Sequence, residues 1–207
     1  LLLDPTNKDL PVQSKKMVFK RKYWLFYLLT LLLGARRQIF TVFALFLLVD
    51  HFAFSVHTVA ILFMINYGIN WFLNPLIGRA INRIGERKLL SIEYSTALVI
   101  FTGYATTGSA WVAGILYILD YIVFNFSIAL RTFFQKIAEP QDIAPTMAVA
   151  QTINHIAAVF VPVLGGWIWV EFGYQIPFFM GAALTCCSLA LVQLIDREIQ
   201  LNAVPKA

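Results

Sequence analysis

The chain has 207 residues, of which 59% are hydrophobic and 13% are charged, and its formal net charge is +5. Soluble domains carry roughly 25% charged residues, so this composition excludes an ordinary soluble domain and indicates an integral membrane protein. The positive charge does not indicate a nucleic-acid partner, because the basic residues fall between hydrophobic runs, where a surface that follows phosphates cannot form.

The N-terminal segment, residues 1–22, has the composition of a linker. It begins Leu1-Leu2-Leu3-Asp4 without an initiator methionine or a secretory signal, and it stays polar and interrupted by proline as far as Ser14. The second part of the segment is strongly basic. We therefore predict a cytoplasmic linker and expect the chain to begin within a longer protein.

Six hydrophobic runs are long enough for helices that cross a bilayer, which need about 20 residues each. The runs are continuous rather than alternating, and this favours helices over the strands of a membrane barrel. The predicted spans are Tyr23–Val49, Val56–Ile77, Leu89–Thr107, Trp111–Phe134, Ala144–Val170 and Tyr174–Ile195. We expect an all-α membrane protein with a six-helix bundle over residues 23–196 and a cytoplasmic tail over 197–207.

Lysine and arginine set the expected orientation. They gather before the first span and between the second and third spans, whereas the connections 50–55, 108–110 and 171–173 contain neither residue. Positively charged loops stay in the cytoplasm. Both termini are therefore predicted to be cytoplasmic. The protein itself is expected in the plasma membrane, as the inner membrane of a prokaryote.

The first span carries two adjacent arginines, Arg36 and Arg37, near its middle. An unpaired guanidinium at this depth costs at least about 2.5–3.5 kcal/mol, so each needs water, an acid or a substrate. Neighbouring residues point about 100° apart on a helix, which predicts that one arginine faces a cavity and the other a neighbouring helix. Two hypotheses remain: an anchor for a carboxylate or phosphate, or a salt bridge with Asp120, Glu93 or an acid outside this chain.

The second span places Asn66, Asn70 and Asn74 on one face, at intervals of four residues. Such a stripe of amides can bind a polar substrate or water, and it can equally join two membrane helices. We expect Asn66 and Asn70 to contact substrate or cavity water, and Asn74 to act in packing or in a gate near Pro75.

A short basic segment joins the second and third spans. It reads Gly78-Arg79-Ala80-Ile81-Asn82-Arg83-Ile84-Gly85-Glu86-Arg87-Lys88. Its glycines and cations resemble the helix-2/helix-3 loop of the Major Facilitator Superfamily, with Asn82 where the family usually has aspartate and Glu86 where a basic residue is usual. Gly85 permits the positive φ of a tight turn. The alternative is an ordinary positive-inside loop of any polytopic protein.

This resemblance implies the C-terminal half of a transporter that is built from two six-helix halves, each containing two inverted three-helix repeats. It implies a second six-helix half as partner, either covalently linked, separately encoded or symmetry-related. It also implies that spans one, two, four and five line a central cavity. The segment would then gate the cytoplasmic side through Gly78, Asn82, Arg83, Gly85, Arg87 and Lys88.

The third and fourth spans differ in polarity. Glu93, near the start of span three, is expected to pair with Arg83 or Arg87. In span four one helical face carries Tyr117, Asp120, Phe124, Ser127 and Arg131. A carboxylate in a membrane span is a candidate for proton coupling, and a permanent salt bridge is the alternative for Asp120. We expect Tyr117 to contact substrate and Arg131 to act as an interfacial or gate residue rather than a ligand.

The fifth span begins after Asp142, whose side chain is expected to cap the helix. Gln151, Asn154 and His155 lie near its middle. We expect Gln151 and Asn154 to contact substrate. Because imidazole titrates near neutrality, His155 is a candidate proton carrier, with a structural hydrogen bond as the alternative.

Sequence signatures of enzymes are missing. The chain contains no glycine-rich phosphate loop, no His-Glu-x-x-His and no nucleophile elbow, so we expect neither an enzyme nor a cofactor or metal. The expected function is secondary, alternating-access transport of a small organic anion with protons, as a symporter or antiporter in contact with lipid. The alternatives are a drug or cation exporter centred on Asp120 and a non-transporting membrane subunit of the same fold.

Overall fold

The structure, a computed structural model, describes residues 19–202, apart from the side chain of Asn74. The predicted linker up to residue 18, the tail from residue 203 and the expected role of Asn74 lie outside the described residues. Within 19–202 the chain is helical and contains no β-strand, which confirms the predicted all-α class.

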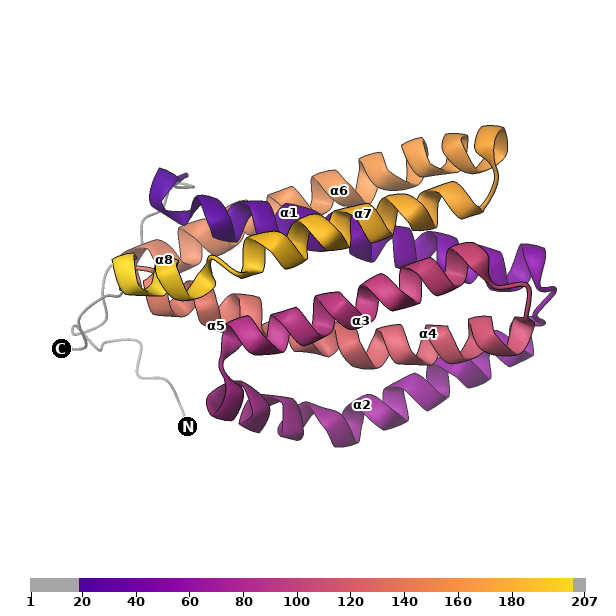
Figure 1. Ribbon diagram of the computed structural model, residues 1–207, viewed down its shortest axis with the longest axis horizontal. Helices are drawn as coiled ribbons and strands as arrows, with labels where there is room; N and C mark the ends of the chain where they lie inside the picture. Colours follow the sequence, from indigo (N-terminus) through magenta and orange to yellow (C-terminus); the bar gives the residue numbers. More distant parts are fainter. Residues whose placement is uncertain (1–18, 203–207) are drawn as a thin grey trace, which may run out of the picture.

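Eight α-helices run roughly side by side along the long axis of the molecule or cap its end (Figure 1). They are α1 (Trp24–Gln38), α2 (Val56–Ile84), α3 (Glu86–Thr106), α4 (Ala110–Phe124), α5 (Ile128–Ile137), α6 (Ile143–Phe172), α7 (Gln175–Val192) and α8 (Ile195–Asn202). Three 3₁₀ turns are η1 (Arg21–Tyr23), η4 (Asn125–Ser127) and η5 (Pro140–Asp142), and two π-helical segments are η2 (Ile39–Ala44) and η3 (Leu47–His51). The π-helical segments continue α1, and η4 joins α4 to α5.

Five of the six predicted spans are long and apolar enough to cross a membrane: Arg21–His51, Val56–Leu73, Ala110–Ile137, Pro140–Phe172 and Gln175–Val192. The remaining predicted span, Leu89–Thr107, is the third along the chain and forms α3. This helix is long enough to cross a membrane, but it is less apolar than the other five. Charged and hydroxyl side chains in its first half explain the difference. Even so, α3 packs between α4 and α7 in the middle of the bundle (Figure 1).

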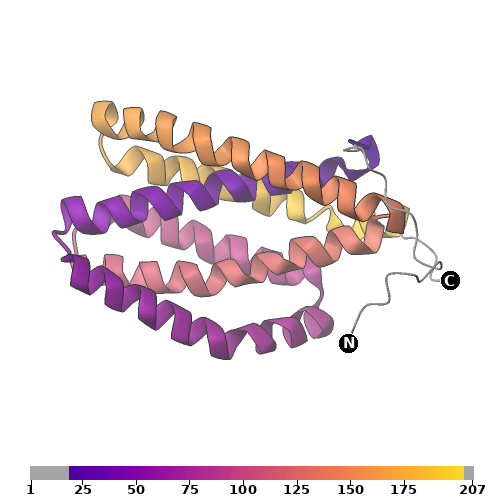
Figure 2. The same cartoon turned by 180° about the vertical axis from the view of Figure 1, so that it is seen from behind.

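The helices are buried to different extents. In both views α2 and α6 lie on opposite sides of the bundle (Figure 2). Only 11% of the apolar window of each is buried, compared with 39–50% for the other three candidate spans. These two helices therefore leave most of their surface free to contact lipid or another protein.

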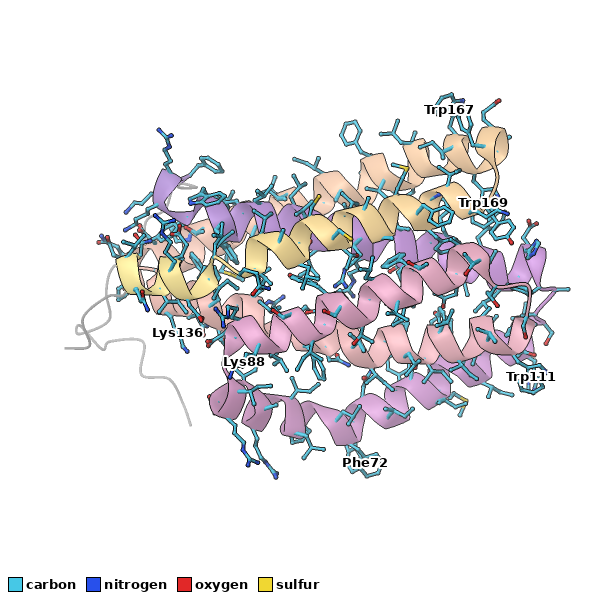
Figure 3. The ribbon with its side chains drawn as sticks, in the orientation of Figure 1. Phe72, Lys88, Trp111, Lys136, Trp167 and Trp169 are labelled. Carbon is cyan, nitrogen blue, oxygen red and sulfur yellow. The ribbon has the colours of Figure 1, made fainter. Side chains whose placement is uncertain are left out.

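The two ends of the bundle differ in chemistry. Lys88 and Lys136 lie toward one end, whereas Trp111, Trp167 and Trp169 lie toward the other (Figure 3). Phe72 points outward from α2, away from the rest of the bundle. Lysine is typical of cytoplasmic ends, whereas tryptophan is found at both membrane interfaces, so the orientation of the bundle stays a prediction.

The basic segment is mostly helical rather than a loop, which corrects the sequence-based interpretation. Helix α2 continues past the predicted end of its span at Ile77 as far as Ile84, and α3 starts at Glu86. Only Gly85 breaks the helix, and its φ of 82° confirms the positive φ expected there. Polar residues at a helix end were mistaken for a loop because a helix can extend beyond the apolar region that it crosses.

A network of polar contacts ties the start of α1 to the start of α6. Asp142 does not cap its helix, contrary to the prediction; its buried carboxylate instead accepts hydrogen bonds from Lys20 Nζ (2.6 Å) and Tyr23 Oη (2.7 Å). The Tyr23 hydroxyl in turn accepts from the backbone N–H of Glu139 (3.2 Å). Lys22 donates a hydrogen bond to Glu139, which lowers the pKa of this carboxyl from its ordinary value.

We expect Tyr23→Phe to lower the free energy of unfolding by about 1–3 kcal/mol, because it removes a hydroxyl that is hydrogen-bonded to a carboxylate. The matched control is Tyr104→Phe. Tyr104 is also fully buried, but its hydroxyl has no hydrogen-bond partner among the described residues. Denaturant titration of the purified protein in detergent micelles measures both, and equal losses of stability would contradict the interpretation.

Candidate functional site

A cavity of about 400 Å³ opens between α1, η4, α5 and α6. Volumes of roughly 300–1,000 Å³ are usual for sites that bind small molecules, so a small solute fits. The cavity is lined by Phe26, Thr30, Leu33, Gly34, Arg37, Gln38, Phe124, Ser127, Leu130, Arg131, Met147, Ala150, Gln151, Asn154, His155 and Ala158. Its wall thus combines polar and aromatic groups.

Positive charge dominates the wall of this cavity. Arg37 and Arg131 both contribute to it, and no carboxylate of the described residues does. Both arginines are exposed, and neither forms an ion pair within residues 19–202. The Arg37 guanidinium lies 4.4 Å from the centre of the Phe124 ring. Arginine stays charged at physiological pH, so the cavity favours an anion.

Irregular backbone flanks both arginines. Arg37 lies in the last turn of α1, directly before the π-helical segment η2, and Arg131 lies in the first turns of α5, after the 3₁₀ turn η4. Departures of this kind from the α-helix are frequent at functional sites. Sequence reasoning missed them, because the hydrophobic pattern runs through both without interruption.

The neighbouring arginine has a different environment. Arg36 is 3% exposed, and its Nη2 donates a hydrogen bond to Oε1 of the fully buried Glu93 on α3. The guanidinium also lies 5.3 Å from the ring centre of Tyr94. The prediction that Glu93 pairs with Arg83 or Arg87 is therefore wrong. The two hypotheses for the adjacent arginines were a salt bridge and an anchor for an anion. Arg36 forms the salt bridge, and Arg37 lines the cavity.

Asp120 lies behind the cavity wall rather than in it. Its side chain is 5% exposed on α4, and its carboxylate interacts electrostatically with both Arg36 and Arg37. It forms no direct ion pair within the described part of the chain. The carboxylate is thus close to the charged groups of the site without neutralising either one directly.

Three predicted residues of α6 line the cavity together. Gln151 Nε2 and His155 Nε2 lie 3.2 Å apart, at hydrogen-bond distance. Asn154 approaches α1 at Gly34, where an added Cβ would come within 2.5 Å of Asn154 Oδ1. A glycine at this position therefore lets α1 and α6 pack closely beside the cavity. Sequence reasoning missed Gly34, and also Thr30 and Gln38.

The remaining predicted ligands lie outside the cavity. Asn66 on α2 is 1% exposed, and neither polar atom of its amide has a hydrogen-bond partner among the described residues. Asn70 accepts a hydrogen bond from Asn125 Nδ2, which joins α2 to η4. Tyr117 is buried, and its ring stacks on that of Phe40 at 5.2 Å between centroids. The structure does not bring these residues together with Arg37.

The residues predicted to form the gate fall into an exposed group and an ion-paired group. Asn82, Arg83 and Lys88 are exposed at the end of the bundle. Arg87 pairs with Asp196 at 3.1 Å, and the neighbouring Glu86 pairs with Lys136 at 2.7 Å. These two contacts hold the start of α3 to α8 and to the end of α5. Gly78 lies within α2, with open space around its Cα.

Comparison with known proteins gives one family. The model of the Major Facilitator Superfamily matches residues 26–205, which include helices α2 to α8 and all of α1 except its first two residues. No curated protein matches the chain.

Proposed function

Because the chain belongs to the Major Facilitator Superfamily, we propose that it carries a small organic anion by alternating access, coupled to protons. The matched family and the apolar helices support an integral membrane protein of the transporter kind. The substrate, the coupling and the plasma membrane as its location are our inferences. We take this chain to be a transporter and not an enzyme, as is general in the family.

The observation that carries the anion proposal is the charge of the cavity wall. Arg37 and Arg131 contribute two permanent positive charges, and no carboxylate of residues 19–202 contributes a negative one. A guanidinium binds a carboxylate or phosphate through two parallel hydrogen bonds. Gln38, Gln151 and Asn154 supply further polar contacts that can orient a solute. A cation exporter would require the opposite charge at this place.

Proton coupling is proposed for Asp120 and His155. Asp120 is buried close to both adjacent arginines, and His155 lines the cavity itself. An anion that binds Arg37 weakens the electrostatic attraction between this guanidinium and Asp120, and protonation of Asp120 frees the guanidinium for the anion. Binding of the proton and binding of the anion then favour each other.

Asp120→Asn is expected to abolish the stimulation of uptake by a proton gradient, because the amide cannot gain or lose a proton. The experiment measures uptake of anionic, neutral and cationic solutes into liposomes that contain the full-length protein, with and without the gradient. Asp50→Asn is the matched control, since Asp50 is exposed at the end of η3, away from the cavity.

Two results of this experiment would contradict the proposal. Uptake restricted to cations favours the exporter, and the absence of uptake of any solute favours a non-transporting subunit. Gradient-dependent anion uptake that survives in Asp120→Asn would instead remove Asp120 from the coupling and leave His155 as the candidate.

A second six-helix half is proposed as the partner of this bundle. The support is the low burial of α2 and α6, together with the exposed polar side chains of Gln151 and His155 on α6. Polar groups that face lipid are costly, so a protein surface or water must cover them. The contacts with substrate that the sequence predicted for Asn66 and Tyr117 would require α2 and α4 to move, because both side chains are buried within this bundle.

Gating is proposed for the segment from Gly78 to Lys88. The exposed Asn82 and Arg83 at the end of α2 are free to contact another helix. Arg87 already ties the start of α3 to α8 through Asp196. A change of contacts at Asn82 would therefore move α2 relative to a fixed α3, about the single break at Gly85.

A further inference from the structure

We propose that the cavity is built for a solute with two anionic groups joined by a short apolar chain, and that Arg131 binds the second group. This inference rests on the proposed anion transport and names the class of substrate. It assigns Arg131 a role as ligand, in place of the gate or interfacial role expected from the sequence.

The first step is charge balance. The wall contains two guanidinium groups without an ion-pair partner in the described chain, one from α1 and one from α5. A monoanion neutralises one of these charges and leaves the other facing the same cavity. A dianion neutralises both. Asp120 does not replace the second anion, because it is not part of the wall and lies near Arg36 and Arg37 instead.

The second step is spacing. Arg37 lies over Phe124, and Arg131 follows Phe124 by seven residues, which corresponds to roughly 10–12 Å along the helix axis. Side chains of a helix lean toward its N-terminus, so Arg131 reaches back toward Phe124 and shortens this separation. Two anionic groups a few ångströms apart fit this arrangement better than a single compact group.

The third step is the apolar part of the cavity wall. Phe124 and Leu130 line the cavity, and so do Met147 and Ala150 of α6. These apolar side chains can bury the apolar spacer of the solute, which is favourable. The same cavity wall therefore supplies two cations and an apolar surface.

The test is isothermal titration calorimetry on the full-length protein in nanodiscs, with succinate, butyrate and inorganic phosphate at equal ionic strength. We expect succinate to bind about 10- to 100-fold more tightly than butyrate, because one additional charged hydrogen-bonding group is worth a factor of this size. Arg131→Gln should remove most of this preference, because the affinity for succinate falls further than the affinity for butyrate. A denaturant titration of the variant in micelles shows whether it is folded. Arg131→Lys should retain part of the preference, since it keeps the charge and loses the two-pronged geometry.

Arg21→Gln is the matched control for loss of one positive charge, because Arg21 is exposed and lies outside the cavity wall. An unchanged preference for succinate in Arg131→Gln would overturn the assignment of Arg131, while anion transport through Arg37 would still stand. Tighter binding of phosphate than of succinate would overturn the spaced dianion. If the wild-type protein bound none of the three anions, the proposed anion transport would fall together with this inference.

Discussion

Replacing Arg37 with glutamine is expected to lower the kcat/KM of anion uptake by about 10- to 100-fold without unfolding the protein. The guanidinium is exposed to the cavity and forms no ion pair among the described residues, and the buried Asp120 keeps its electrostatic interaction with Arg36 when Arg37 is replaced. What is lost is the charged hydrogen bonding to the solute. Initial rates of uptake into liposomes, measured over a range of solute concentrations, report the change.

Two further variants make the Arg37 result specific. Arg37→Lys should give an intermediate rate, because it keeps the charge but not the planar fork. Arg21→Gln removes an equal charge outside the cavity and should transport as the wild type does. Undiminished uptake by Arg37→Gln would refute the role of this residue as an anion ligand.

Breaking the buried ion pair between Arg36 and Glu93 should destabilise the protein by about 3–5 kcal/mol, because either single change leaves a buried charge without a partner. Arg36→Met and Glu93→Leu are the two single changes. Combining them removes both charges and should recover most of the lost stability, since an apolar pair of similar volume is often as stable as a buried ion pair. Denaturant titration of the four proteins in micelles measures the coupling.

The control for this cycle is an exposed pair. Asp196→Asn breaks the contact with Arg87, in which the side chains are 53% and 38% exposed, and should change stability by about 0–1 kcal/mol. A double variant no more stable than the two single variants would show that the pair does not hold α1 against α3 in the way described.

The class of fold, the family and the positions of most helices could be predicted from the sequence. Long apolar runs are a strong signal, because a bilayer permits few other structures. Gly85 was also predictable, since a positive φ is unfavourable for residues with a Cβ. The ends of the helices were less predictable, and the segment from Gly78 to Ile84 was read as a loop although it continues α2.

Partners across the bundle could not be predicted. Helical periodicity indicated that Arg36 and Arg37 face different directions, and the structure agrees with that expectation. It did not reveal how far α3 is shifted along α1, and this shift brings Glu93 to Arg36 rather than to Arg83 or Arg87. The same limitation hid the place of Arg131. The sequence put Phe124, Ser127 and Arg131 on one face, but it did not reveal that Arg37 of α1 lines the same cavity.

The π-helical segments that follow Arg37 also determine how long the first span is. As a regular α-helix, the 31 residues from Arg21 to His51 would extend about 46 Å, well beyond the hydrocarbon thickness of about 30 Å. A wider turn advances less along the axis per residue, so η2 and η3 shorten this helix without removing residues from it. They thereby reduce the difference between the length of the helix and the thickness of the bilayer. Without them, the helix would have to tilt further to fit.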